Sequence, residues 1–213
     1  MMKSEEIIRV LDIYYPDARC ELNYHKDYEL LIATVLSAQC TDKRVNMVTK
    51  VLFEKYDLKG LKEADTKDIE SIIRPCGSHT KKSRYIKIIA TRLIVDKDGF
   101  ILKEKNETRK ELESLPGVGR KTCNVVLSNL YNLPAIAVDT HVTRVSIRLG
   151  LAKESDNVSI IEQKLMKKFP KDKWSRLHHQ LVLFGRYQCT ARNPKCEECL
   201  LKDNCRYYKN KVN

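Results

Sequence analysis

Apolar residues recur at the three- and four-residue spacing of an amphipathic helix along most of the chain. The pattern is clearest in five segments, whose apolar positions are Ile7, Ile8, Leu11 and Tyr15; Val45, Val48 and Leu52; Ile86, Ile89, Ala90 and Leu93; Val158, Ile161, Leu165 and Phe169; and Trp174, Leu177, Leu181 and Phe184. This spacing places each set on one face of a helix. The strict alternation of a half-buried strand is missing, so the sequence predicts an all-α protein of about ten helices.

Residues 28–38, YELLIATVLSA, differ from these segments because they are apolar on nearly every side. A helix of this kind is enclosed by other helices, so we expect it at the centre of the fold. Proline and glycine fall between the periodic segments, as turn residues do. A proline-containing turn at residues 132–134 indicates a seam between two helical blocks.

The charge balance makes this helical protein a candidate binder of phosphate. The 213 residues include 40 Lys and Arg against 28 Asp and Glu, which gives a net charge of +12. Such an excess is typical of proteins that bind a nucleic-acid backbone. A highly charged, solvated surface is the alternative that composition alone leaves open.

The first fifteen residues, MMKSEEIIRVLDIYY, contain acidic side chains and no continuous apolar run. This pattern excludes a signal or transit peptide, and no stretch has the uncharged length that crossing a membrane requires. We therefore expect a cytoplasmic protein with no membrane partner. Eight cysteines in a reducing compartment should be thiols or metal ligands rather than disulfides.

Half of the cysteines crowd into one segment near the C-terminus. They form a C-x6-C-x2-C-x5-C pattern at Cys189, Cys196, Cys199 and Cys205. Four thiolates suit either zinc or an iron–sulfur cluster, and the spacing alone does not choose between them. Arg192 and Lys195 lie between the first two cysteines, so the metal could hold a basic loop toward phosphate. A solvated loop is an equal alternative.

Residues 115–121, LPGVGRK, indicate a tight turn between two helices, one ending near Glu113 and the next starting near Arg120. Glycine at positions 117 and 119 permits a sharp turn and lets the backbone amides approach a ligand closely. Amides at the start of a helix bind anions, and a DNA phosphate is a candidate here. Turns without any function look similar.

The helix after this turn places one lysine away from the expected core. The core-facing positions are Cys123, Val126, Leu127 and Leu130, and the positions opposite them are Lys121, Asn124, Val125 and Ser128. A lysine in the first turn feels the positive end of the helix dipole, which disfavours its ammonium form. Lys121 is therefore a candidate nucleophilic amine, although an ordinary solvated lysine fits the same geometry.

A second candidate group lies in AIAVDTHVTRVSIRLG, residues 135–150. Asp139 is placed to cap the helix that follows it, and the same carboxylate could also face a cleft and accept a proton. For His141, in the same turn, we expect a local hydrogen bond rather than a chemical role.

Three motifs in this order, LLIATVLSAQCTD, LPGVGRKT and VDTHVTRV, together with the four-cysteine tail, resemble the endonuclease III family of helix-hairpin-helix DNA glycosylases. The resemblance implies a six-helix barrel over residues 22–133, which contains the hairpin, and a cluster domain over residues 1–21 plus 134–213. It also implies a [4Fe–4S] cluster on the four cysteines, a monomer, and a catalytic cleft between the domains that receives a flipped nucleotide.

The resemblance further implies a chemistry for two residues. Lys121 aligns with the family's nucleophile and Asp139 with its catalytic aspartate, so a bifunctional glycosylase and abasic-site lyase is expected, acting through a Schiff base and β-elimination. The partner would be double-stranded DNA with an oxidised pyrimidine or an abasic site, at the nucleoid. The expected DNA contacts are Gln39, Gly117, Val118, Gly119, Arg120, Arg192 and Lys195.

One segment departs from the family pattern. Where that family commonly has a bulky apolar wedge after a glycine, this chain has Ser78 and His79. A polar wedge could change which bases are opened, so a glycosylase for mispaired thymine or uracil is an alternative. A noncatalytic DNA-binding module stapled by metal is another, and an electron carrier a third. An adenine glycosylase is disfavoured by Lys121 and by the lack of an extra domain after Cys205.

Overall fold

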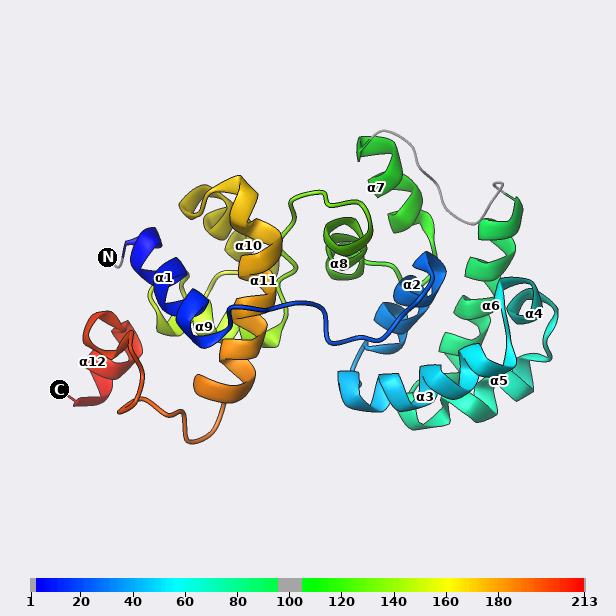
Figure 1. Ribbon diagram of the computed structural model, residues 1–213, viewed down its shortest axis with the longest axis horizontal. Helices are drawn as coiled ribbons and strands as arrows, with labels where there is room; N and C mark the ends of the chain where they lie inside the picture. Colours follow the sequence, from blue (N-terminus) through cyan, green and yellow to red (C-terminus); the bar gives the residue numbers. More distant parts are fainter. Residues whose placement is uncertain (1–2, 96–104, 213) are drawn as a thin grey trace. The chain divides into compact units, whose positions relative to one another are not determined.

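The computed structural model describes residues 3–95 and 105–212. Within these ranges every regular element is helical, which confirms the predicted fold class (Figure 1). The chain divides into two compact units: unit 1 comprises Met1–Arg19 and Asn132–Asn213, and unit 2 comprises Cys20–Tyr131. None of the described helices has the length and apolar character needed to span a lipid bilayer.

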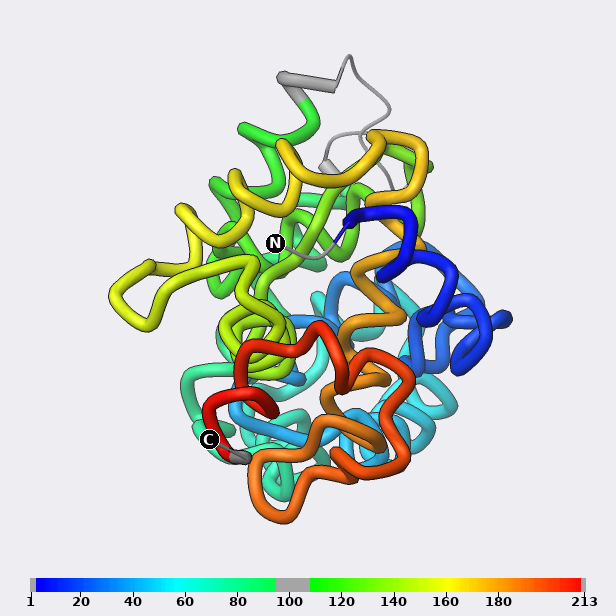
Figure 2. Tube along the Cα trace, turned by 90° about the vertical axis from the view of Figure 1, so that its left-hand side faces the viewer, coloured from blue at the N-terminus to red at the C-terminus, as the bar shows by residue number. Residues whose placement is uncertain are grey.

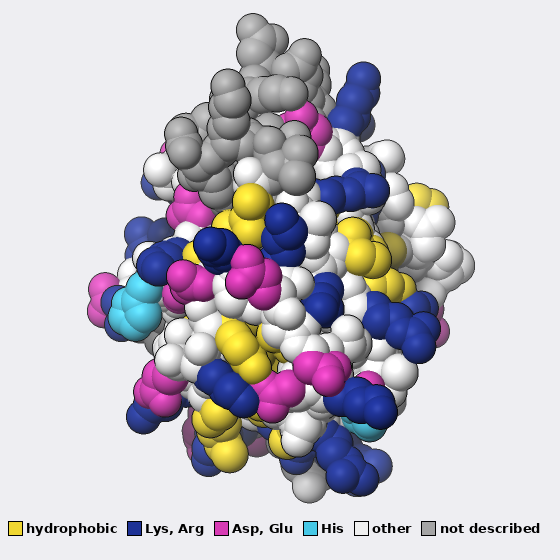
Figure 3. Space-filling view, turned by 90° about the vertical axis from the view of Figure 1, so that its right-hand side faces the viewer, with side chains coloured by type: hydrophobic (Ala, Val, Ile, Leu, Met, Phe, Trp, Pro, Cys, Tyr) yellow, Lys and Arg dark blue, Asp and Glu magenta, His cyan; other side chains and the backbone are white. Residues whose placement is uncertain are grey.

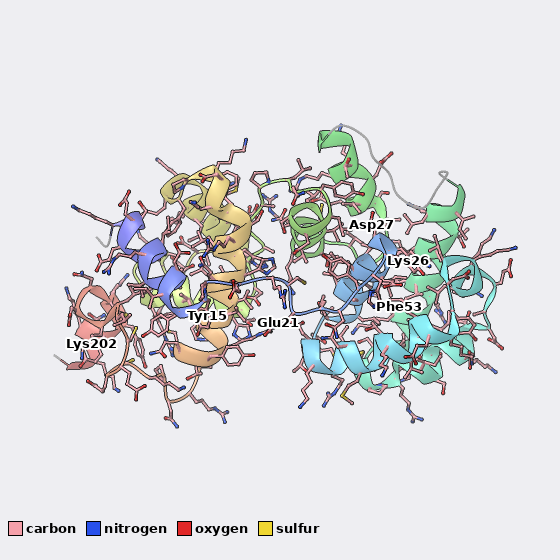
Figure 4. The ribbon with its side chains drawn as sticks, viewed as in Figure 1. Tyr15, Glu21, Lys26, Asp27, Phe53 and Lys202 are labelled. Atoms are coloured by element: carbon pink, nitrogen blue, oxygen red, sulfur yellow. The ribbon has the colours of Figure 1, made fainter. Side chains whose placement is uncertain are left out.

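Unit 2 is built around one enclosed helix. Its elements are α2 (Asp27–Leu36), α3 (Asp42–Lys55), α4 (Leu58–Glu63), α5 (Thr66–Ile73), the 3-10 turn η1 (Arg74–Cys76), α6 (His79–Val95), α7 (Lys105–Ser114) and α8 (Arg120–Leu130). Every residue of α2 from Tyr28 to Leu36 is buried, and α2 contacts α3, α6 and α8. The prediction of a central helix in this segment is confirmed. Phe53, labelled in Figure 4, meets the ring of Tyr28 edge-on.

The charged surface is mixed in sign. On the face that Figure 3 shows, Lys and Arg side chains are interspersed with Asp and Glu. One ion pair of unit 2 joins Lys55 to Asp68 at 2.7 Å. Because both side chains are well exposed, this pair adds little to stability.

In unit 1 the N-terminal helix packs against the C-terminal part of the chain, drawn in blue and in orange to red in Figure 2. Its elements are α1 (Ser4–Tyr14), α9 (Thr140–Arg148), α10 (Val158–Lys168), η2 (Lys171–Lys173), α11 (Trp174–Leu183), the π-turn η3 (Phe184–Gln188), η4 (Lys202–Asn204) and α12 (Arg206–Val212). One hydrophobic core joins α1, α9, α10 and α11. Its formation buries apolar faces that none of these helices could cover alone.

Helix α1 also holds the cysteine-bearing segment in place. Tyr14 Oη donates to the carbonyl oxygen of Glu198 at 3.0 Å and accepts from the backbone N–H of Leu200 at 3.2 Å. Gln180 Nε2 donates to Asp12 Oδ1 at 2.8 Å, which ties α11 to α1. The two ends of the chain thus form one unit through both apolar and polar contacts.

Candidate functional site

The predicted turn between two helices lies where the sequence placed it, between the end of α7 at Ser114 and the start of α8 at Arg120. The backbone N–H of Val118 donates to the Leu115 carbonyl at 3.1 Å and closes the turn. Gly117 has φ +80°, and a Cβ there would lie 2.7 Å from the Tyr85 ring. Glycine is therefore required at 117 both by its backbone conformation and by close packing.

Gly119 has a different role from Gly117. Its φ is −90°, and a Cβ built on it would meet nothing within 4 Å. It is the N-cap of α8 without a side-chain bond, and the first turn of α8 holds no acidic residue. The positive end of α8 is thus left open to an anion, and the absence of a side chain at 119 lets that anion come close.

The other predicted hairpin contacts divide into two kinds. Arg120 is exposed at the start of α8. Val118 is only 5% exposed, and its N–H is used inside the turn. Val118 therefore secures the hairpin to the core, whereas Gly119 and Arg120 present groups to the outside.

Lys121 is the second residue of α8, and its side chain is exposed. Within the part of the chain that the structure describes, its ammonium makes no hydrogen bond and no ion pair. Its charge does act on a neighbouring thiol: burial raises the pKa of Cys20 to about 11, and Lys121 works in the opposite direction. The amine is thus available to a ligand.

The prediction for the rest of that helix face was wrong. Asn124, Val125 and Ser128, expected opposite the core, are all buried. Helix α7 packs against this face, and Arg109 Nη2 donates to Asn124 Oδ1 at 2.7 Å. Two faces of α8 are thus covered, and Lys121 lies on the exposed side of the helix, next to Arg120.

Asp139 caps α9, as predicted. Its Oδ1 accepts from the backbone N–H groups of His141 and Val142, both at 2.8 Å. Asp139 also lines a cavity of about 760 Å³ in unit 1, together with Thr143 and Arg144. Because both cap bonds fall on Oδ1, Oδ2 keeps its lone pairs for a cation or a proton.

His141 makes the local hydrogen bond that we expected. Arg144 Nη2 donates to its Nδ1 at 3.2 Å. Burial lowers the pKa of His141, which favours the neutral ring that can accept this bond. The start of α9 also packs closely on Gly185, because a Cβ added there would lie 2.8 Å from His141 Cβ.

The four C-terminal cysteines surround one small cavity. Cys205 is buried, and Cys189, Cys196 and Cys199 are half-buried. Among the described residues, no three His, Cys, Asp or Glu side chains converge closely enough to hold a single metal ion. A four-iron cluster binds each thiolate at a different iron, so a set of thiols lining one cavity suits it.

Two arginines that the sequence did not single out hold the segment that carries Cys189. Arg144 Nε donates to the Cys189 carbonyl at 3.1 Å, and its Nη2 donates to the Gly185 carbonyl at 2.6 Å. Arg148 Nη1 donates to the Thr190 carbonyl at 2.7 Å and to Cys189 Sγ at 3.4 Å. Their recurrence four residues apart on α9 was the only sequence signal, and it does not say what they contact.

Arg192 and Lys195 lie on the loop between Cys189 and Cys196, with exposed side chains. Their carbonyls are fixed from inside: Thr190 Oγ1 donates to Arg192 O, and Gln188 Nε2 to Lys195 O, both at 2.7 Å. The backbone of this loop is thus held while its cations face outward. Lys202, labelled in Figure 4, lines the cysteine cavity and donates to the Glu197 carbonyl at 2.9 Å.

Gln39 and Ser78 are exposed residues with positive φ, at 57° and 45°. Gln39 follows α2, and Ser78 precedes α6. His79, the other polar residue at the expected wedge, is held back because its Nδ1 lies 2.9 Å from Glu70 Oε1. Ser78 is therefore the polar side chain that this loop presents.

The fold and these motifs define a class of DNA-repair protein. Residues 32–171 match the HhH-GPD superfamily of base excision DNA repair proteins, and residues 189–205 match the iron–sulfur binding domain of endonuclease III. Endonuclease III from Bacillus subtilis is 45% identical over 193 residues, which cover 90% of this chain and 86% of that protein.

The chain belongs to the endonuclease III family. A solved structure described as a trapped endonuclease III–DNA covalent intermediate, an estranged-adenine complex, matches with a TM-score of 0.90 at 45% identity over the full length of both chains. A thermostable thymine-DNA glycosylase matches with a TM-score of 0.81 at 24% identity over 97% of this chain and 96% of that one, a likeness of fold alone.

This membership gives the enzyme class and the cofactor. The protein is a DNA glycosylase and abasic-site lyase of base excision repair, and it carries a [4Fe–4S] cluster domain. The cysteine spacing left zinc and iron–sulfur open, and family membership decides for the iron–sulfur cluster. It also excludes the two alternatives without glycosylase activity, the noncatalytic DNA-binding module and the electron carrier. The homologous structure is a complex with DNA.

Proposed function

We propose that Lys121 is the nucleophile of this glycosylase and lyase. The observation that carries the proposal is the position of its amine: exposed, and without a hydrogen-bond or ion-pair partner in the described residues, at the start of an enclosed helix beside the open Gly119. The amine attacks C1' of the deoxyribose as the base leaves, which forms a Schiff base. The imine makes the neighbouring sugar carbon acidic, and β-elimination then expels the 3' phosphate.

Asp139 assists at the sugar. Two backbone N–H groups of α9 fix its Oδ1, so the carboxylate has a defined orientation in its cavity. It accepts a proton from the attacking amine or stabilises the positive charge that develops on the sugar. Lys121 lies in the domain expected over residues 22–133, and Asp139 lies in the domain expected over residues 1–21 plus 134–213.

The DNA contacts would come from two segments, the start of α8 and the cysteine loop, which carry exposed cationic side chains or backbone amides. Gly119 and Arg120 bind a phosphate at the start of α8, and Arg192 and Lys195 bind one from the cysteine loop. Gln39, an exposed residue with positive φ after the end of α2, enters the gap that the flipped nucleotide leaves.

The four cysteines would hold the cluster, and the cluster keeps the basic loop in shape. Burial raises the pKa values of Cys196 and Cys199, with nearby thiols adding to the effect. The cluster, when bound, supplies positive iron ions that keep such thiols deprotonated. Arg148 donates to Cys189 Sγ and reduces the charge on that ligand.

The substrate would be double-stranded DNA with an oxidised pyrimidine or an abasic site, handled by a monomer in the bacterial cytoplasm at the nucleoid. Ser78 is the specific observation that favours a second candidate, a mispaired thymine or uracil, because a polar side chain stands at the expected wedge. A panel of duplexes with different lesions separates the two: preference for oxidised pyrimidines supports the first.

The experiment on the nucleophile compares Lys121→Gln with Lys110→Gln, an exposed lysine on α7. We expect Lys121→Gln to lose strand cleavage at abasic sites and to keep DNA binding, because phosphate contacts are spread over many basic residues. Lys110→Gln should keep both. Full cleavage by Lys121→Gln would refute the assignment.

A further inference from the structure

Two cysteines outside the C-terminal segment lie close together within unit 2. Cys40 follows the end of α2, Cys76 ends η1, and the Cys40 thiol is near enough to help raise the pKa of Cys76. Cys76 is 2% exposed, whereas Cys40 is half-buried and reachable from solvent. The pair therefore combines one accessible thiol with one sheltered thiol.

A single buried ammonium holds the two segments together. Lys82, 5% exposed, donates through Nζ to the carbonyls of Leu36 at 3.0 Å, Ala38 at 2.8 Å and Cys76 at 2.8 Å. The backbone N–H of Cys40 donates to Ser37 O at 3.1 Å. Because Lys82 bonds to both segments, the thiols are kept close together by the fold rather than by chance encounter.

The pair also lies at the base of two exposed loops with unusual backbone. Gln39, directly before Cys40, has φ 57°, and Gly77 and Ser78, directly after Cys76, have φ 66° and 45°. Such conformations persist only where the surrounding contacts enforce them. A covalent change at the two sulfurs would reach both loops at once.

We propose that Cys40 and Cys76 form a site of reversible oxidation, in which hydrogen peroxide converts the two thiols to a disulfide. The Cys40 thiolate attacks one oxygen of the peroxide, breaks the O–O bond and becomes a sulfenic acid, while the other oxygen leaves as water after taking a proton. The Cys76 sulfur then attacks the Cys40 sulfur and expels the second water. Two electrons pass from the thiols to the peroxide, and a dithiol reductant reverses the change.

The environment fits this order of events. Burial, together with the nearby Cys40 thiol, raises the pKa of Cys76 to about 12, while the charges of Lys82 and Arg44 act against that rise. Cys76 thus stays a protonated, sheltered thiol until a sulfenic acid forms beside it. Cys40, the half-buried member that solvent can reach, is the one that meets the oxidant.

Formation of the bond would restrict the loops. A disulfide holds its sulfurs about 2.05 Å apart and its two Cβ atoms about 3.8 Å apart, so the bond would tie the segment that carries Gln39 to the segment that carries Ser78. Oxidation would then hinder the opening of a base-paired lesion. This effect on excision rests on the proposed function, whereas formation of the disulfide does not. Oxidation would affect an abasic site less, because no base has to be flipped there.

The direct test is peptide mapping of the cluster-containing protein after limited treatment with hydrogen peroxide, alkylation of free thiols and trypsin digestion. Trypsin releases Cys40 in the segment 27–43 and Cys76 in the segment 68–81, because the Arg74–Pro75 bond resists cleavage. We expect these two segments to be linked while Cys20 and Cys123 are alkylated and the visible absorbance of the cluster is retained. Sulfinic acid at Cys40 without a link, or bleaching of the cluster before any link forms, would overturn the proposal.

Two variants sharpen this result. Cys40→Ser should leave Cys76 alkylated after peroxide, and Cys123→Ser, a buried thiol of the same unit, should leave the link unchanged. A link from Cys76 to another cysteine in Cys40→Ser would contradict the pairing. The peptide mapping is first done on the parent protein without any substitution, so the result does not depend on how well a variant folds.

A second readout concerns excision under single-turnover conditions. Oxidised protein should excise a base-paired lesion about tenfold more slowly, a change of about 1.4 kcal/mol in the barrier, and dithiothreitol should restore the rate. Cys40→Ser should be insensitive to the oxidant. Equal rates before and after link formation would overturn the effect on the loops. A missing link refutes only this inference, whereas failure to form a lysine adduct with DNA refutes only the proposed function.

Discussion

Arg148 Nη1 donates to the carbonyl oxygen of Thr190 at 2.7 Å, across 42 positions of the chain. The same guanidinium lies 3.4 Å from Cys189 Sγ, and its Nη2 donates to the Ala191 carbonyl at 3.2 Å. One side chain on α9 therefore fixes the backbone at the start of the cysteine loop. The conformation of this basic loop thus depends on α9 as well as on the cluster.

We expect Arg148→Ala to destabilise unit 1 by about 2 kcal/mol, because bonds from a charged donor to two carbonyls are lost. The cluster should also be retained less well during chelation. Thermal unfolding and iron content measure the two effects, with the exposed Arg9→Ala as control. Unchanged stability and iron content in Arg148→Ala would show that the loop does not depend on this contact.

The two roles of Asp139 can be separated by two substitutions. Asp139→Asn keeps a capping side chain and should leave stability nearly unchanged, whereas Asp139→Ala should lose about 1 kcal/mol. Both should slow base excision by about a hundredfold, because both remove the carboxylate. The free energy of unfolding and the single-turnover excision rate are measured for both variants. Normal excision by Asp139→Asn would leave only the cap as its role.

The two hairpin glycines should respond in opposite ways. Gly117→Ala should cost at least about 2 kcal/mol, because φ is positive and the new Cβ would meet the Tyr85 ring. Gly119→Ala should fold normally, since space and φ both permit alanine, and should weaken DNA binding by crowding the phosphate. Denaturant unfolding and titration with a duplex at fixed salt distinguish them. Equal DNA affinity of Gly119→Ala and the parent would argue against a phosphate at this position.

Loss of a cluster ligand should act on folding more than on chemistry. Cys199→Ser is expected to give a poorly folded C-terminal region with little visible absorbance, because metal binding and folding are coupled. Cys123→Ser, which removes a thiol from α8, should keep its absorbance. Near-ultraviolet circular dichroism and proteolysis report on the fold. A colourless, protease-resistant and active Cys199→Ser protein would contradict a structural role for this ligand.

Much of the fold was predictable because periodicity reports which face of a helix is apolar. The enclosed α2, the turn between α7 and α8 and the cap at Asp139 all follow from local pattern. The domain limits predicted at 22–133 stay a prediction, as do the roles of the site residues. Local pattern also suffices for the cysteine motif, since its four members are close in sequence.

What the sequence did not predict depends on contacts between distant segments. A helix wheel cannot say that α7 covers Asn124, so a face that looks polar was taken as exposed. The same limit hides the bracing of the cysteine loop by Arg144 and the closeness of Cys40 to Cys76. In each case a polar or ambiguous residue is explained only by a partner that the fold supplies.

The central claim is that the amine of Lys121 bonds to the sugar, and borohydride reduction during reaction with abasic-site DNA tests it most directly. Digestion of the trapped protein and mass analysis should place the adduct on Lys121, and Lys121→Gln should form none. An adduct on another lysine, or undiminished trapping by Lys121→Gln, would contradict the account.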